Sequence, residues 1–203
     1  MEEKPAPTRE RILDAAIEVF STKGYHNTRM DDIVDAAHSS KGSIYFHFPS
    51  KEDIFFGLVD KFASLLEKRL QNVIETESSG IARVQKALTV CVETFGNYQS
   101  LAKIFLIQAV GLGQAFELKR EETKERFALI IQKQIEQAIA EGEIPPLDAE
   151  TAAHVWMGAL YDVVIRWVTT GQPTPERMLP TLQTMLLRSI GVGEEKIKEV
   201  TRH

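Results

Sequence analysis

Residues 28–53, TRMDDIVDAAHSSKGSIYFHFPSKED, are the most informative stretch of the chain. Apolar residues recur at helical spacing through residues 30–37, residues 38–40 interrupt them, and a second short apolar pattern covers residues 41–46. Ser40 is a good N-cap for the second of these helices. The spacing predicts a helix-turn-helix, in which the second helix enters the major groove of DNA by its N-terminal end.

The second helix carries side chains that suit DNA. Small residues at its start let the backbone approach closely, and hydroxyls and helix amides suit phosphates and base edges. These first residues are Ser40, Lys41, Gly42 and Ser43, and Tyr45 and His47 then present polar tips on the outer face, with Lys51 following. Residues 36–51 contain two lysines, two histidines and no acidic residue. The local charge therefore favours contact with phosphate.

Composition narrows the class of protein. The chain has 203 residues, of which 43% are hydrophobic and 26% charged, which is ordinary globular usage. The net charge of −5 argues against a protein that coats nucleic acid by bulk charge, but it leaves room for a compact DNA-reading motif. The single cysteine, Cys91, allows neither an internal disulfide nor a Cys/His zinc site.

The N-terminus and the hydropathy pattern predict where the protein works. Met1–Pro5 has no apolar signal region, and no apolar run approaches the roughly 18 residues of a membrane span. We therefore expect a soluble, cytoplasmic protein with no membrane partner.

Helical periodicity continues through the rest of the chain and predicts an all-α fold of about nine helices. Three short helices precede longer ones, as in a helical bundle. The expected domains are a helix-turn-helix DNA-binding domain over residues 1–53, a helical bundle over residues 54–191, and a charged tail over residues 192–203, of which residues 194–203 fray.

Two stretches carry a resemblance to a known family. Residues 8–25, TRERILDAAIEVFSTKGY, and residues 42–53, GSIYFHFPSKED, resemble the N-terminal domain of the TetR/AcrR family of bacterial repressors. The resemblance covers about residues 8–68, and the expected helix count agrees with it. It implies a homodimer that binds a palindromic operator in double-stranded DNA. It also implies that residues 54–191 are a ligand-binding and dimerisation domain, with a C-terminal pocket whose ligand releases that DNA.

The resemblance also implies roles for individual residues. Thr28 would cap the first helix of the motif and touch phosphate, and Arg29 would reach adjacent phosphates. Ser40, Lys41, Gly42 and Ser43 would form the groove-facing start of the recognition helix, while Tyr45, His47 and Lys51 would contact the DNA backbone. Two positions depart from the family. His38 stands where glycine is usual, so a left-handed backbone there has a cost, and Ser39 replaces a small apolar residue.

The C-terminal half carries a looser resemblance. Residues 156–167, WMGALYDVVIRW, and residues 141–144, EGEI, are similar to the acyl-CoA-responsive repressors of fatty-acid degradation. A hydrophobic pocket between helices is a common ligand site, and an acyl chain gains about 0.8 kcal/mol per buried CH₂. The expected ligand-binding residues are Phe62, Phe95, Tyr98, Phe105, Phe127, Trp156, Tyr161 and Arg166, although the aromatic ones fit a packed core equally well. The last two helices, about residues 148–170 and 176–190, are expected to pair with their mates in the homodimer.

Three functions remain open at this stage. The first is a repressor released by a hydrophobic small molecule, with a long-chain acyl-CoA as one candidate. The second is a DNA-binding regulator with a different hydrophobic or multidrug-type aromatic effector, or with none. The third is an enzyme, but the sequence has no nucleophile–base pair, metal set or phosphate loop, so we expect no catalytic residue, no cofactor and no metal. Glu150 and His154 lack the repeated spacing of a di-iron bundle.

Overall fold

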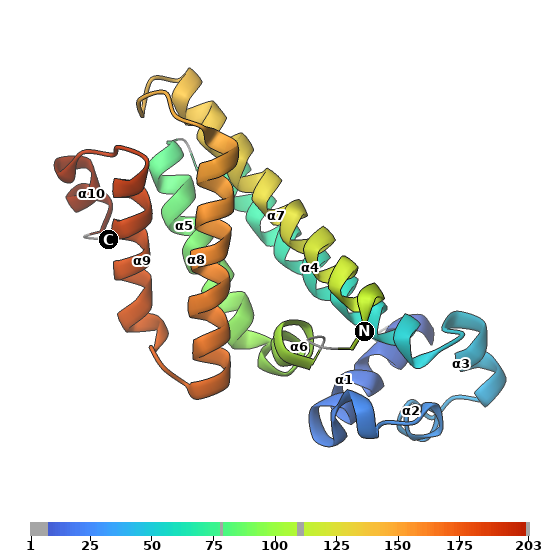
Figure 1. Cartoon of the computed structure of the whole chain (residues 1–203). Helices are drawn as coiled ribbons and strands as arrows, with labels where there is room; N and C mark the ends of the chain where they lie inside the picture. Colours follow the sequence, from blue (N-terminus) through green and yellow to red (C-terminus); the bar gives the residue numbers. More distant parts are fainter. Residues whose placement is uncertain (1–7, 78, 109–111, 202–203) are drawn as a thin grey trace, which may run out of the picture. The chain divides into compact units, whose positions relative to one another are not determined.

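The computed structural model describes residues 8–77, 79–108 and 112–201, and every regular element within those ranges is a helix (Figure 1). It contains ten α-helices and one π-helix in the described part of the chain, which confirms the all-α prediction. The helices are α1 (Thr8–Asn27), α2 (Met30–Ala36), α3 (Lys41–His47), α4 (Lys51–Thr76), α5 (Gly80–Asn97), α6 (Gln99–Lys103), the π-helix η1 (Ile104–Gln108), α7 (Gln114–Ala140), α8 (Ala149–Thr170), α9 (Pro175–Ser189) and α10 (Glu194–Thr201). None of the helices described here is long and apolar enough to cross a bilayer.

The chain packs as two compact units. The first comprises the described residues up to Ser64 together with Tyr98–Glu117, and the second comprises Leu65–Asn97 and the described residues from Leu118 onward. Helices α4 and α7 each contribute residues to both units.

The first unit is built on α1, which packs against both α2 and α3. The apolar residues of α1 recur at i, i+3, i+4 and i+7, so one stripe of the helix is buried. Ile33 of α2 and Ile44 of α3 are also fully buried. An aromatic group made of Phe20, Tyr25, Phe55, Phe56 and Phe116 joins α1, α4 and the start of α7, with ring centroids 5.0–6.4 Å apart.

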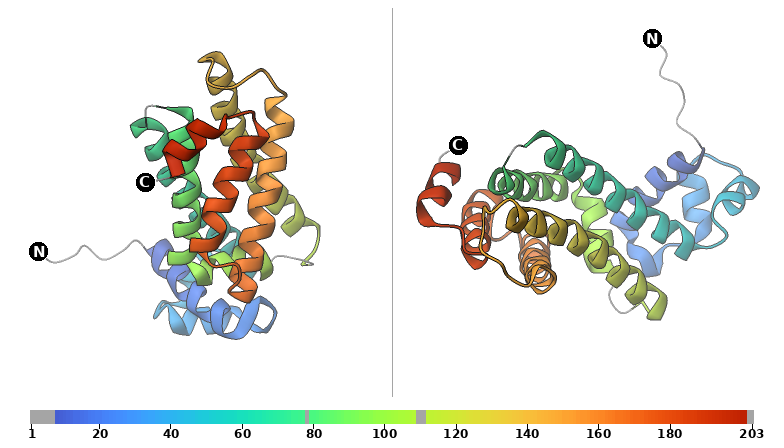
Figure 2. Two further views of the ribbon diagram at one scale, coloured as in Figure 1. Left: turned by 90° about the vertical axis from the view of Figure 1, so that its left-hand side faces the viewer. Right: turned by 90° about the horizontal axis from the view of Figure 1, so that it is seen from above.

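The second unit is a bundle in which α5, α8 and α9 run side by side (Figures 1 and 2). Its core includes Ile135, Trp156, Leu160, Leu182 and Leu186. Long helices with one apolar face form such a core because each covers the face of its neighbours.

The end of the chain differs from the sequence-based expectation of a frayed tail. Residues 194–201 form α10, which raises the number of α-helices from the expected nine to ten among the described residues. Val192 and Ile197 are buried in the core of the second unit, and Arg188 forms a two-pronged ion pair with Glu194 at 2.6 and 2.9 Å. Two apolar side chains among many charges were therefore enough to dock this segment.

Candidate nucleic-acid interface

The turn between α2 and α3 has the geometry that the sequence predicts. His38 has φ = 47°, so it adopts the left-handed backbone expected where the family uses glycine. The Ser40 hydroxyl accepts a hydrogen bond from the Ser43 backbone N–H at 3.2 Å and thereby caps α3. Ser39 is half-buried, and its hydroxyl donates to the Ala37 carbonyl at 3.2 Å. The unusual residues His38 and Ser39 thus alter the turn without abolishing it.

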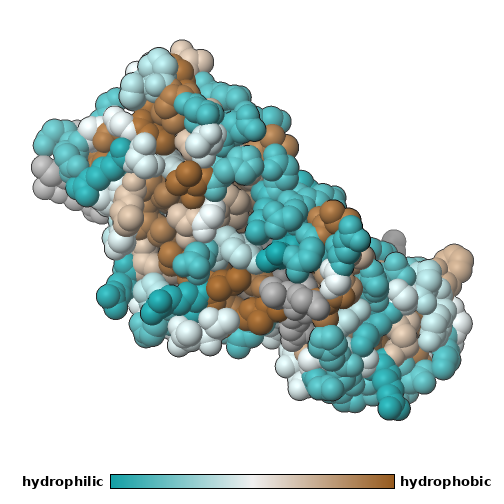
Figure 3. All heavy atoms as spheres, in the orientation of Figure 1, coloured by the Kyte–Doolittle hydropathy of each residue, from teal (hydrophilic) through white to brown (hydrophobic). Residues whose placement is uncertain are grey.

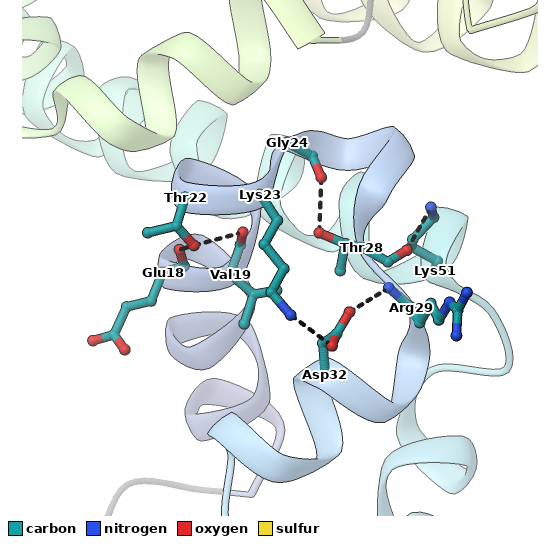
Figure 4. A network of polar contacts seen from close by, with 9 residues as sticks. All are labelled: Glu18, Val19, Thr22, Lys23, Gly24, Thr28, Arg29, Asp32 and Lys51. Carbon is teal, nitrogen blue, oxygen red and sulfur yellow. Dashed lines mark hydrogen bonds and ion pairs between the residues drawn. The ribbon is translucent and has the colours of Figure 1, made fainter.

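The start of α2 differs from the prediction. Arg29, not Thr28, is the N-cap residue, and its backbone N–H donates to the Asp32 carboxylate at 2.8 Å (Figure 4). The Thr28 hydroxyl instead donates to the Gly24 carbonyl at 2.8 Å, and the residue is 2% exposed. Gly24 has φ = 76°, so the regular helix breaks there and leaves this carbonyl for Thr28. The prediction that Thr28 caps α2 is therefore wrong, whereas Arg29 is exposed on the surface.

Lys51, at the start of α4, is held by main-chain carbonyls. Its ammonium donates to the carbonyls of Tyr25 at 2.7 Å and Thr28 at 2.8 Å, with that of His26 at 3.5 Å. Figure 4 shows the side chain of Lys51 directed at the backbone of Thr28. The ammonium also lies 4.3 Å from the centroid of the Tyr25 ring. Burial lowers the pKa of Lys51, and the side chain ties α4 to the segment that connects α1 with α2.

Lys41, on α3, has a different environment. Its ammonium pairs with the Asp31 carboxylate at 2.7 Å, and both side chains are more than 60% exposed. The hydrogen bond that the Lys41 ammonium donates to Asp31 raises the pKa of Lys41, and the attraction of the carboxylate acts in the same direction. Exposed ion pairs of this kind contribute little to stability. A DNA phosphate can therefore replace the Asp31 carboxylate at low cost.

The remaining α3 residues divide into a buried and an exposed face. Ile44 and, just beyond the helix, Phe48 are buried and hold α3 against the first unit. Gly42 is exposed, Tyr45 is 40% exposed, and Ser43 and His47 are half-buried. Phe46 is 84% exposed and was not among the residues predicted from the sequence. Its position two residues after the buried Ile44 places it on the outer face, which is a signal that the sequence did contain.

The predicted ligand-binding residues are distributed over both units. Phe62 is buried in the first unit, where Tyr98 is 43% exposed, whereas Phe95, Phe127 and Trp156 are buried in the second unit. The Trp156 indole N–H donates to the Ser189 hydroxyl at 2.9 Å, as expected for a satisfied core tryptophan. The side chain of Phe105 lies outside the described residues.

The second unit also contains the last two predicted ligand-binding residues, Tyr161 and Arg166, and a small cavity. Tyr161 is half-buried, and its buried hydroxyl has no hydrogen-bond partner among the described residues, while the Lys124 ammonium lies 4.7 Å from the ring centroid. Arg166 is exposed. The small cavity, lined by Ile81, Gln134 and Leu187 among others, has a volume of about 10 Å³, which is at the lower limit for one water molecule.

A helix-turn-helix with an exposed second helix, leading into an all-helical bundle, defines the class of helix-turn-helix transcriptional regulators. Comparison with known families then identifies the group within this class. The family described as "Bacterial regulatory proteins, tetR family" matches residues 12–58, and "Tetracyclin repressor-like, C-terminal domain" matches residues 96–188. Together the two matches cover more than half of the chain, which belongs to the TetR family. Its members are transcriptional regulators and not enzymes.

Individual relatives are distant but match over most of their length. The regulator YdgC of Bacillus subtilis is 25% identical over 92% of this chain and 94% of its own. The fatty acid metabolism regulator protein of the same organism is 24% identical over 82% and 86%. Among solved structures, the fatty acid degradation regulator FadR of Bacillus halodurans has a TM-score of 0.81 at 20% identity, covering 91% of this chain and 97% of that one. FadR of Bacillus subtilis, solved with stearoyl-CoA, has a TM-score of 0.78 at 22% identity over 87% and 96%. Acyl-CoA-responsive regulators are thus among the distant homologues.

Proposed function

We propose that this chain is a cytoplasmic, homodimeric repressor whose α3 helix binds the major groove of a palindromic operator. The observation that carries the proposal is the division of α3 into an anchored face and an outer face. Ile44 and Phe48 fix the helix, while Lys41, Gly42 and Tyr45 face solvent. The major groove is about 12 Å wide and admits one such helix. Arg29 and His47 supply further contacts to phosphate under this proposal.

The exposed face of α8 supports dimerisation. Val155 on α8 and Met185 on α9 are 60% and 61% exposed, and apolar patches interrupt the polar surface in this region (Figure 3). Residues 151, 155, 158 and 162 are all exposed and follow heptad-like spacing, and a Cβ at Gly158 would meet no atom within 4 Å. A second copy of α8 can therefore approach closely. A two-fold dimer would set the two recognition helices about 34–36 Å apart, one turn of DNA.

The effector that best fits is a hydrophobic small molecule, with a long-chain acyl-CoA as the first candidate. Two relatives support this choice: FadR of Bacillus subtilis was solved with stearoyl-CoA, and AibR was solved with isovaleryl coenzyme A and operator DNA. The buried Tyr161 hydroxyl has no hydrogen-bond partner among the described residues, and the Lys124 ammonium lies over the Tyr161 ring. Both side chains could therefore bind a polar group of the effector. Each CH₂ of an acyl chain adds about 0.8 kcal/mol on burial, so a long chain suffices to drive a two-state switch.

A second candidate is a DNA-binding regulator with a different hydrophobic or multidrug-type effector, or with no small-molecule input. The burial of Phe95, Phe127 and Trp156 in the second unit favours it, because side chains that fill a core need no ligand.

The test combines DNA selection with effector titration. The full chain is used to select duplexes from a random library, and its mass is measured by sedimentation velocity. We expect the wild type to be a dimer that enriches a palindromic duplex. We expect the Val155→Glu variant to be a monomer that enriches no palindrome. Stearoyl-CoA should then weaken binding to the selected duplex at least tenfold, whereas free coenzyme A should not. A palindrome-binding dimer that no acyl-CoA affects would favour the second candidate. A monomer that enriches no duplex would end the proposal.

A further inference from the structure

Two features of α3 have no role inside the folded chain. Phe46 is 84% exposed, and its ring lies edge-on to that of the adjacent His47 with centroids 5.3 Å apart. Gly42 lies one helical turn earlier, and a Cβ there would meet no atom within 4 Å. Residues four apart share one face of a helix. Gly42 and Phe46 therefore lie together on the face opposite the buried Ile44.

Both features are unfavourable for the isolated protein. Glycine within a helix is less stable than alanine, and neither crowding nor a left-handed backbone requires it at position 42. An aromatic ring left in water gains none of the free energy of apolar burial. Both features become useful when another surface comes close to this face of α3.

We propose that Phe46 reads the 5-methyl group of a thymine, with Gly42 allowing the backbone to approach the base edges one turn earlier. This inference rests on the proposed DNA-binding function. Thymine presents a methyl group in the major groove, and phenylalanine is one of the side chains that contact it. One helical turn rises about 5.4 Å, and base pairs stack about 3.4 Å apart. Phe46 thus reaches a base pair one or two steps from the one that faces Gly42.

The surroundings of Phe46 favour DNA over a protein partner. Protein interfaces are built around a core of several apolar residues. The other exposed large hydrophobic residues of the described chain, apart from Tyr45, lie outside α3: Tyr98, Leu118, Leu129, Val155 and Met185. Residues 36–51 contain no acidic residue, although Lys41 pairs with Asp31 of α2 and backbone carbonyls hold Lys51. A single exposed apolar ring matches a single methyl group in the major groove better than it matches the apolar core of a protein interface.

The experiment removes the methyl group and the ring separately. A duplex selected from a random library by the full wild-type chain is remade with deoxyuridine in place of each thymine in turn, which deletes only the methyl. For the wild type we expect one position in each half-site at which this change weakens binding about fourfold per methyl. For Phe46→Ala the same change should have no effect. Phe46→Leu, which keeps an apolar group, should retain part of the sensitivity.

Controls separate this inference from the function on which it rests. Leu129→Ala removes another exposed apolar side chain, on α7, and should keep the wild-type pattern of uridine sensitivity. Because the Phe46 side chain is exposed, Phe46→Ala should melt at the wild-type temperature. The inference is overturned if Phe46→Ala and the wild type share the same uridine pattern, or if the variant loses affinity for every duplex equally. If the wild type enriches no duplex at all, the DNA-binding function itself has failed.

Discussion

The recognition helix α3 and the first turn of α4 each carry a lysine of the same sequence motif, and the two lysines have different surroundings. Lys41 on α3 is exposed and pairs with an exposed carboxylate. Lys51 on α4 is held by backbone carbonyls and by the face of an aromatic ring. A cation whose partner is a solvated carboxylate is free to exchange that partner for phosphate, whereas a cation bound by fixed carbonyls stabilises the fold. The lysines in the sequence therefore predicted where cations lie in the motif, but they did not show that Lys41 is available to DNA and that Lys51 is bound within the fold.

The strongest test of this difference is Lys51→Ala. The substitution removes the ammonium donor from the carbonyls of Tyr25 and Thr28, and the Tyr25 carbonyl then keeps only the Thr28 backbone N–H at 3.3 Å. We expect the free energy of unfolding to fall by about 2 kcal/mol, and the melting temperature to fall by about 6 °C for a chain of this size. Differential scanning calorimetry measures both. If Lys51→Ala instead melts at the wild-type temperature and reduces the salt dependence of DNA binding, Lys51 contacts DNA and does not stabilise the fold.

The reciprocal test is Lys41→Ala. Because the ion pair with Asp31 is exposed, melting should be unchanged. The slope of log K against log[salt] for DNA binding should become shallower by about 1 for each subunit, as expected for one lost phosphate contact. Fluorescence anisotropy between 50 and 200 mM salt gives the slope. Lys133→Ala, which removes an exposed charge from α7, is the matched control and should leave the slope as it is.

A smaller effect of the opposite sign is expected for Asp31→Asn. This change removes both the partner of Lys41 and a negative charge beside the groove-facing helix. Affinity should rise about threefold for all sequences alike, and more at low salt, where charges are screened least. Asp35→Asn takes the same charge from the next turn of α2. If both variants gain affinity for DNA equally, the gain comes from the change in net charge and not from the release of Lys41.

The local features of the site could be predicted from the sequence because they depend on neighbouring residues. Ser40 caps α3 through a residue three positions away, and His38 takes the left-handed backbone within its own turn. The breaks between helices likewise depend on residues that are close together in the sequence. These features need no knowledge of how distant segments pack.

The remaining features depend on packing between residues far apart in the sequence. Lys51 finds its carbonyl partners about 25 residues earlier, and Thr28 bonds to a carbonyl that is exposed only because Gly24 breaks α1. The docking of α10 depends on Ile197 meeting the bundle core. Whether an aromatic residue such as Trp156 lines a pocket or fills a core is likewise a property of the packed bundle, because both states bury the same side chain.

The smallest effect concerns pH and the second unit. His154 on α8 contacts the Glu150 carbonyl at 2.9 Å and the Glu125 carboxylate at 3.1 Å. The hydrogen bond to the Glu150 carbonyl, followed by that to Glu125, raises the pKa of His154 above its ordinary value of 6.5. A raised pKa means that the folded state binds the proton more tightly. The stabilisation is thus fully present below pH 6.5 and is lost as the pH rises through the folded pKa.

His154→Gln should therefore lower the melting temperature of the chain slightly at pH 6 and not at pH 8. Titration of the His154 ring by NMR should give a midpoint above 6.5. Glu125→Gln removes one of the two causes and should move that midpoint down only part of the way, because the Glu150 carbonyl remains. DNA binding should be indifferent to both variants at either pH. A pH effect of His154→Gln on the affinity for the selected duplex would instead show that the contacts of His154 influence DNA binding by α3.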